Sequence, residues 1–220
     1  MRMLNKAVYL IKSKDTFAAI EHLTEEKNPV VVIKNFSELV RLLYWQEKDL
    51  HNVITIGRAA IQYGLSYDND EVRKVAKAIA YNVASFTWPG WDEIGLKITP
   101  DQKAMGLDAA KVCVRLAKEL MQEDIAKSRA RWILGAHYLA AGNVDQAKYN
   151  FYRASVYANR AGNPEEALLS WAFIYIVKRD WNELEVIKSR LDPMENGRSF
   201  IQQINTAMRV FGDAPVHITE

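Results

Sequence analysis

Residues 134–154, LGAHYLAAGNVDQAKYNFYRA, are the stretch that decides the fold. Two apolar segments flank Gly142, a residue that accepts the backbone conformations of tight turns. Gly135 and Ala154 are small and let two helices approach closely, while Phe151 is large enough to fill the space between them. The stretch therefore predicts two helices that pack against each other across a short turn.

The same helical pattern extends along the chain, because residues typical of helix N-caps recur three positions before Glu or Gln. This spacing lets the cap and the third helical residue satisfy each other's free backbone donors. The pairs are Asn35/Glu38, Asp68/Glu71, Thr99/Gln102, Asn143/Gln146, Asn163/Glu166 and Asp180/Glu183. Each pair precedes an amphipathic segment, so the sequence predicts an all-α chain.

Helical periodicity places about ten helices along the chain. The expected ranges are 2–12, 15–27, 36–47, 50–65, 69–87, 101–121, 124–141, 144–160, 164–178, 181–191 and 195–211. The β-branched segment 30–33 has no second strand to pair with, and we interpret it as a buried connection or an early helical turn. Residues 87–99 contain Pro89, Gly90 and Gly95, which predict a loop insertion between two long helices.

Residues 128–161 resemble a tetratricopeptide repeat (TPR), a helix–turn–helix unit that stacks into solenoids. The resemblance lies in Gly135, Tyr138, Gly142, Ala147, Phe151 and Ala154. A weaker match covers 34–67. The resemblance implies one TPR-like α-solenoid domain over 1–211, with 212–220 as a frayed tail. A helical bundle with one repeat-like hairpin is the alternative.

Composition limits the classes of function. Nearly half of the 220 residues are hydrophobic, and a net charge of +2 is spread evenly, so we expect no nucleic-acid partner. Cys113 is the single cysteine, which fits a reducing compartment. Neither a signal-peptide pattern nor an apolar segment of membrane-spanning length is visible. The sequence predicts a cytoplasmic protein that does not bind membranes.

We find no motif that carries known chemistry. The chain lacks a Gly-rich phosphate loop, and it has neither a His-Glu-x-x-His pattern nor a cysteine pair that would suggest a zinc site. None of its four histidines is part of a Glu-x-x-His motif. Cys113 lies among small apolar residues, where a buried, inert thiol is expected. We therefore predict no metal, no cofactor and no enzymatic activity.

The TPR resemblance implies which side chains line a concave groove. In the best repeat these are Arg129, Trp132, Ala136 and Leu139, and Trp45 takes a corresponding position in an earlier helix. Ala136 stands where the family's peptide-carboxylate clamp has asparagine, so that clamp is not expected. We predict a protein- or peptide-binding adaptor that uses Trp45, Arg129, Trp132 and Leu139, with Trp91 at the rim.

Two tryptophans, Trp88 and Trp91, flank Pro89 and Gly90 in the inserted loop. They suggest an alternative function, a small-molecule binder or sensor in which this loop lies over the end of the groove. Burial of the same side chains in the core is the simpler interpretation, above all for Trp88. A homodimer through the terminal helices is a further possibility, because helix 195–211 has a pronounced apolar face.

Overall fold

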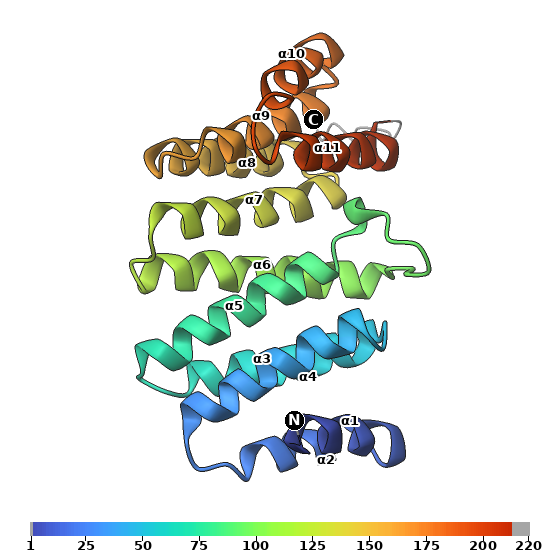
Figure 1. The fold of residues 1–220 in the computed structure, drawn as a ribbon, viewed down its shortest axis with the longest axis vertical. Coiled ribbons are helices and arrows are strands. Elements are labelled where there is room, and N and C mark those ends of the chain that lie inside the picture. Colours follow the sequence, from blue (N-terminus) through green and yellow to red (C-terminus); the bar gives the residue numbers. More distant parts are fainter. Residues whose placement is uncertain (1, 213–220) are drawn as a thin grey trace. The chain divides into compact units, whose positions relative to one another are not determined.

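The computed structural model describes residues 2–212, and all regular structure within them is helical. Residues 2–212 form eleven α-helices, which are labelled in Figure 1. Their bounds are α1 Arg2–Ser13, α2 Thr16–Thr24, α3 Pro29–Trp45, α4 Leu50–Leu65, α5 Asp70–Phe86, α6 Pro100–Glu119, α7 Asp124–Ala140, α8 Val144–Arg160, α9 Pro164–Lys178, α10 Trp181–Leu191 and α11 Gly197–Phe211. A short 3₁₀ turn, η1 Pro89–Trp91, lies in the predicted insertion. Of the predicted tail, residues 213–220 lie outside the described residues.

Capping side chains fix the starts of the later helices as predicted. The side-chain oxygens of Asn143, Asn163 and Asp180 each accept a hydrogen bond from the backbone N–H three residues on. Thr99 and Gln102 form the reciprocal pair, since each side chain accepts from the other residue's backbone N–H.

The start of α3 differs from the prediction. The helix begins at Pro29, and the side chain of Asn28 accepts from the backbone N–H of Val30. Asn35, predicted as a cap, therefore lies inside the helix. The cause is the Asn28-Pro29 pair, a cap followed by proline at the first helical position, which outweighs the β propensity of residues 30–33. Of the two open interpretations of that segment, the early helical turn is confirmed.

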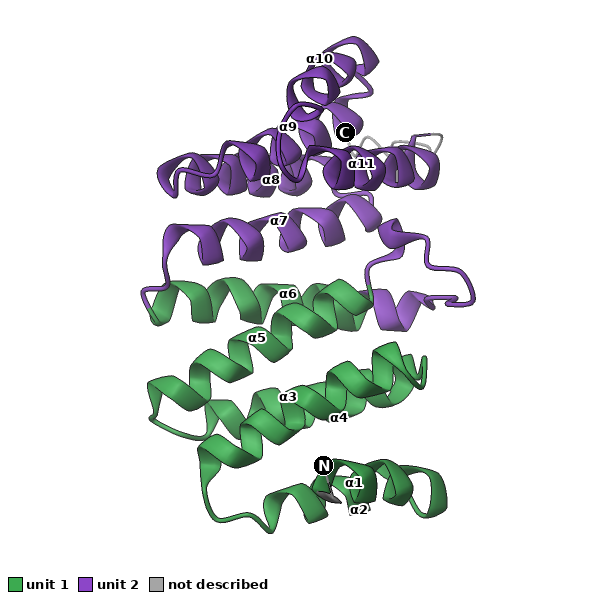
Figure 2. Ribbon diagram, in the orientation of Figure 1, with its two compact units in different colours: residues 1–87, 104–120 green, residues 88–103, 121–220 purple. Residues whose placement is uncertain are grey.

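The chain forms two compact units, which Figure 2 shows in different colours. Unit 1 consists of Met1–Thr87 and Ala104–Leu120, and unit 2 of Trp88–Lys103 and Met121–Glu220. The boundary passes through the insertion and the first turn of α6, so η1 belongs to unit 2 and most of α6 to unit 1.

In unit 1, helices α3, α4 and α5 all pack against one another. Two glycines on α4 allow this close approach, because a Cβ at Gly57 would collide with Val83 of α5 and a Cβ at Gly64 with Ala76. Leu116 of α6 joins this core beside Ala76. Small residues at the contact positions therefore determine how closely these helices lie.

In unit 2, α7 and α8 form the hairpin that the opening stretch predicts. A Cβ at Gly135 would lie 2.9 Å from Cδ1 of Phe151, which is fully buried. The Ser128 hydroxyl donates to the Ala154 carbonyl at 2.9 Å, and Gly142 in the turn has a φ of 73°. The predicted roles of Gly135, Phe151 and Gly142 are confirmed.

Consecutive helices continue to pack on one another after this hairpin, as α8 contacts α9, and α9 contacts α10 and α11. The fold is thus an all-α, solenoid-like series of antiparallel helix hairpins. Within residues 2–212, no helix combines the length and the apolar character needed to cross a bilayer.

Candidate functional site

The predicted groove face of α7 is covered by the chain's own insertion. Trp132 is only 7% exposed and Ala136 is fully buried. The indole N–H of Trp88 donates to the Ala136 carbonyl at 2.9 Å, and the rings of Trp88 and Trp132 meet edge to face with centroids 5.4 Å apart. The groove position expected for Trp132 is therefore wrong, because η1 and its flanking tryptophan fill the space in front of it.

These tryptophans form the centre of an aromatic cluster in unit 2. The Trp132 ring lies 4.9 Å from that of Phe173 on α9, and the Trp88 ring lies 5.9 Å from that of Phe211 on α11. The indole nitrogen of Trp132 is buried and has no hydrogen-bond partner among residues 2–212. Aromatic pairs of this kind contribute about 0.5–1.5 kcal/mol each beyond the area they bury, so the cluster stabilises the unit.

The first part of the insertion, around Trp88 and Trp91, packs inward. Trp88 is fully buried, as the simpler interpretation expected, and Trp91 is half-buried with its ring 4.9 Å from that of Trp88. Asp92 accepts two hydrogen bonds from the Arg209 guanidinium, at 3.1 and 2.7 Å, which ties the insertion to α11. The part of the insertion around Trp88 and Trp91 is thus packed against unit 2, whereas Ile94 further along the loop is exposed.

The other two predicted residues of α7 have different surroundings. Arg129 is exposed and forms an ion pair with Glu166 of α9, with nitrogen and oxygen 2.6 Å apart. Leu139 is half-buried near the end of the helix. The structure therefore does not bring Arg129, Trp132 and Leu139 together on one accessible surface.

Trp45, at the end of α3 in unit 1, is the predicted aromatic residue that is clearly accessible, with 61% of its surface exposed. Tyr44 and Phe86 stack face to face with ring centroids 3.8 Å apart. Trp45 meets both rings edge to face, at 4.8 Å from Tyr44 and 5.9 Å from Phe86. The amine of Lys48 lies 5.6 Å from the Trp45 ring. Trp45 is thus an exposed aromatic side chain supported by a buried stack.

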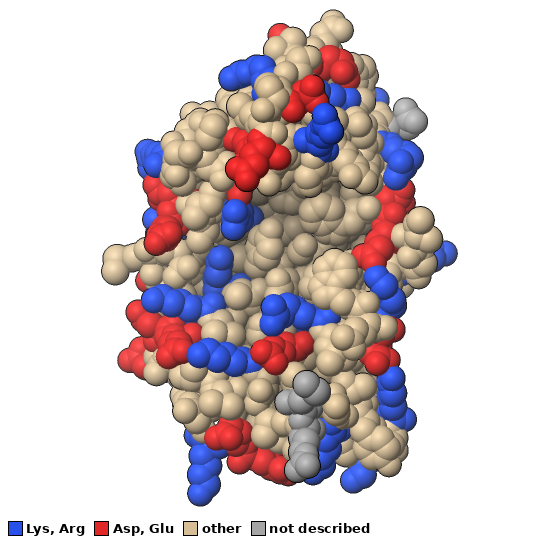
Figure 3. Space-filling view, in the orientation of Figure 1, with Lys and Arg blue, Asp and Glu red and all other residues tan. Residues whose placement is uncertain are grey.

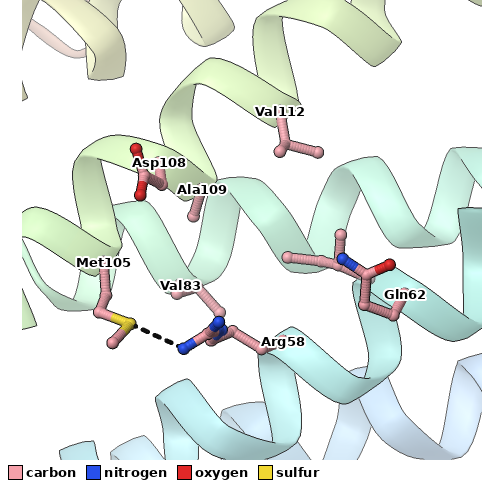
Figure 4. Close-up of a pocket in the computed structure, with 8 residues that line it drawn as sticks. Arg58, Gln62, Val83, Met105, Asp108, Ala109 and Val112 are labelled. Atoms are coloured by element: carbon pink, nitrogen blue, oxygen red, sulfur yellow. Dashed lines mark hydrogen bonds between the residues drawn. The ribbon is translucent and has the colours of Figure 1, made fainter.

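A pocket of about 270 Å³ opens between α4, α5 and α6 of unit 1 (Figure 4). Its apolar lining comes from Ile61, Val83, Met105, Ala109 and Val112, and its polar lining from Arg58, Gln62 and Asp108. Ligand pockets for drug-sized molecules measure about 300–1,000 Å³. This one is smaller and matches a single inserted side chain or a small fragment.

The polar residues of the pocket differ in the partners they already have. The Arg58 guanidinium donates to the sulfur of Met105 at 3.2 Å, the bond drawn in Figure 4. Asp108 accepts from Lys111 at 3.1 Å. Among residues 2–212, Arg58 makes no ion pair, so its charge remains available to an acidic group.

The pocket connects with Trp45 through α5. Val83 lines the pocket, and Phe86, which supports the Trp45 ring, follows three residues later on the same helix. Residues three apart are neighbours on a helix surface. Helix α5 therefore contributes to both, through the buried side chains of Val83 and Phe86.

Two titratable side chains of unit 1, Cys113 and Tyr63, have pKa values raised by burial. Burial raises the pKa of the Cys113 thiol to about 11, and Lys77 offsets only part of that shift. Burial also raises the pKa of Tyr63, with a further contribution from its hydrogen bond with Tyr67. Across residues 2–212, no three His, Cys, Asp or Glu side chains are grouped so as to hold a metal ion.

Surface charge is mixed in sign. In the face that Figure 3 shows, Lys and Arg residues are interleaved with Asp and Glu residues. Ion pairs such as Arg73–Glu119 and Lys34–Glu71 join neighbouring helices of unit 1. The arrangement fits the small net charge and offers no continuous basic surface on that face.

Sequence reasoning did not find the pocket residues. Arg58 and Gln62 are spaced by one helical turn on α4 and read as part of an ordinary solvated face. The pair Ala109-Ala110 could have indicated the pocket, because the small side chain of Ala109 on α6 leaves space beside the neighbouring helices. No protein-family model matches this chain, and no curated protein is significantly similar to it in sequence.

Proposed function

We propose that this protein is a TPR-like helical-repeat adaptor that binds a peptide segment of a partner protein on unit 1. The single observation that supports this most is the α4–α6 pocket, with its apolar floor and its polar edge. Binding surfaces of proteins often combine one apolar anchor with a few polar groups that set its orientation. Helical-repeat proteins characteristically bind in this way.

The partner segment would insert an apolar side chain into the pocket. Val83, Ala109 and Val112 supply the apolar contact, and the volume of about 270 Å³ suits one such side chain better than a cofactor. Fully burying a side chain of the size of Leu or Phe contributes about 1.5–3 kcal/mol. This anchor alone would give weak binding, so further contacts are needed.

Arg58 and Trp45 provide those contacts. The guanidinium of Arg58 would pair with a carboxylate of the partner beside the anchor, since no acid of the described chain occupies it. Trp45 would pack on the next part of the segment along α5. Tryptophan and arginine are the residues most often found at the energetic centre of protein interfaces.

The proposal also includes a cytoplasmic location and a role in binding. A buried thiol with a raised pKa needs no disulfide partner, which agrees with a reducing, cytoplasmic location. The protein would act by binding, through a small pocket of mixed apolar and polar lining.

A library of random peptides, selected on the wild-type protein, tests the proposal. The affinity of the enriched peptides is measured by fluorescence anisotropy for wild type, for Ala109→Leu and for Ala104→Leu. Ala109→Leu fills the pocket and should weaken binding by about tenfold or more, because it excludes the anchor.

Ala104→Leu is the matched control, since it makes the same change at an exposed position of the same helix. It should leave the affinity within about twofold. Peptides that bind Ala109→Leu as tightly as wild type would show that the pocket is not the anchor site.

A further inference from the structure

A second surface, on unit 2, carries alternating tyrosine and basic side chains along the α7–α8 hairpin. On α8 it consists of Tyr149, Arg153, Tyr157 and Arg160, which share one side of the helix by their spacing. Lys127 and Arg131 of α7 lie beside them. We call these six residues the Tyr–Arg surface.

Contacts between the two helices order this surface. The Arg131 guanidinium lies 6.0 Å from the centre of the Tyr149 ring and donates to the side-chain oxygen of Asn150 at 3.0 Å. The Arg153 guanidinium lies 5.4 Å from the Tyr157 ring and donates to the Tyr157 hydroxyl at 3.1 Å. That hydrogen bond raises the pKa of Arg153 above its ordinary value, so it is charged at every working pH.

The positive charges here are not balanced by carboxylates. Asp124 and Asp145 are the nearest acids along the two helices, and each is already paired with a lysine, Lys127 and Lys148. Arg131, Arg153 and Arg160 make no ion pair with any residue of 2–212. Arg131 and Arg153, which are partly exposed and held by hydrogen bonds, and Arg160, which is exposed, therefore carry charge that no carboxylate of the described residues balances.

From this arrangement we propose that the Tyr–Arg surface binds an acidic peptide segment, whose Asp or Glu carboxylates pair with Arg131, Arg153 and Arg160. The guanidinium groups match carboxylates in shape and charge, and the tyrosine hydroxyls supply further donors. Tyr149 remains 48% exposed and can pack against the backbone of the bound segment. The inference rests on the proposed adaptor function, and it adds the chemical class of the partner.

Single-stranded nucleic acid fits the same surface less well. Stacking of bases needs aromatic rings with free faces. The Tyr157 ring already has Lys127 at 5.9 Å and Arg153 at 5.4 Å from its centre. The surface also lacks the longer run of unpaired cations that a phosphate backbone requires.

Fluorescence anisotropy with defined probes tests this proposal. The probe is a fluorescein-labelled peptide of alternating glutamate and alanine, about twelve residues long, and it is compared with a lysine–alanine peptide and with oligothymidylate of similar charge. Wild type should bind the acidic peptide most tightly. Raising the salt concentration from about 50 to about 300 mM should weaken that binding, because screening shortens the range of the attraction.

The Arg131→Gln/Arg153→Gln variant should bind the acidic peptide about tenfold more weakly, from a loss of about threefold for each arginine. Arg190→Gln/Arg198→Gln removes the same charge from α10 and α11 and should change the affinity less than about twofold. Thermal unfolding would test whether both variants are folded. If loss of the Arg131–Asn150 hydrogen bond destabilises the double variant, the single variant Arg153→Gln is measured in its place.

Three results would overturn the inference: no binding of the acidic peptide, equal losses in both double variants, or tighter binding of oligothymidylate. Continued binding of the library-selected peptides through the α4–α6 pocket would then leave the adaptor function standing. Equal binding of the library-selected peptides to Ala109→Leu and wild type, with retained binding of the acidic peptide at the Tyr–Arg surface, would instead reject only the pocket.

Discussion

Replacing Trp132 with alanine is expected to destabilise the protein severely, because its ring lies in the aromatic core of unit 2. Trp132 is only 7% exposed. Its ring centroid lies 5.4 Å from that of Trp88 and 4.9 Å from that of Phe173. Truncation of buried aromatic side chains to alanine lowers the free energy of unfolding by about 3–5 kcal/mol. That is a large part of the about 5–15 kcal/mol that stabilises an ordinary domain.

Replacing Trp132 with phenylalanine separates the ring from its N–H group. The buried indole nitrogen has no hydrogen-bond partner, and such a group costs about 1–3 kcal/mol. Phenylalanine removes that cost while it loses part of the ring's packing, so the two effects oppose each other. We expect Trp132→Phe to remain within about 1.5 kcal/mol of wild type.

Urea unfolding followed by far-ultraviolet circular dichroism measures both changes. Trp45→Ala is the matched control, since Trp45 is 61% exposed and should lose only about 1 kcal/mol with its edge-to-face contacts. If the two units unfold separately, tryptophan fluorescence reports mainly on unit 2, which holds five of the six tryptophans. A loss below about 1 kcal/mol in Trp132→Ala would refute the assignment of Trp132 to the core.

Three further changes test the packing, a cap and the cysteine. Gly135→Ala should lower the free energy of unfolding by about 1–2 kcal/mol, since its Cβ would lie 2.9 Å from the Phe151 ring, and adding Phe151→Leu should recover part of that loss. Asn163→Ala should cost about 1 kcal/mol through loss of the α9 cap, whereas exposed Asn159→Ala should change the unfolding midpoint little. Burial raises the pKa of Cys113 to about 11, so the thiol is protonated at pH 8. Iodoacetamide should therefore modify Cys113 slowly in the native protein and quickly in urea. Rapid labelling of the native protein would contradict the burial of Cys113.

Local sequence signals were sufficient for most of the helices. Asn143, Asn163 and Asp180 each cap a helix because a short polar side chain directly before an amphipathic segment satisfies free backbone donors wherever the chain lies in the fold. The α7–α8 hairpin was predictable for a similar reason, since Gly135 and Phe151 contact each other between two helices that are consecutive in the sequence. Two predicted caps differ. Helix α3 begins earlier, at the stronger cap Asn28-Pro29. Helix α5 is capped by Asn69, whose side chain accepts from the Val72 backbone N–H, and not by the predicted Asp68.

The candidate site was far less predictable, because it depends on contacts between distant residues. Trp132 and Trp88 are separated by more than forty positions, and nothing local indicates that the Trp88 indole donates to the Ala136 carbonyl. A helix face that looks free in one repeat is therefore covered by an insertion that precedes it in sequence. The α4–α6 pocket likewise requires Arg58 and Asp108, from two helices, to be placed together.

Methyl NMR of the protein with labelled alanine and valine tests the central claim most directly, that unit 1 binds a peptide at the α4–α6 pocket. A library-selected peptide is titrated into the wild-type protein. The account predicts the largest chemical-shift changes at the methyl groups of Val83, Ala109 and Val112, and none at exposed Ala104. Changes that spare these three pocket residues and occur at other alanines and valines would contradict it.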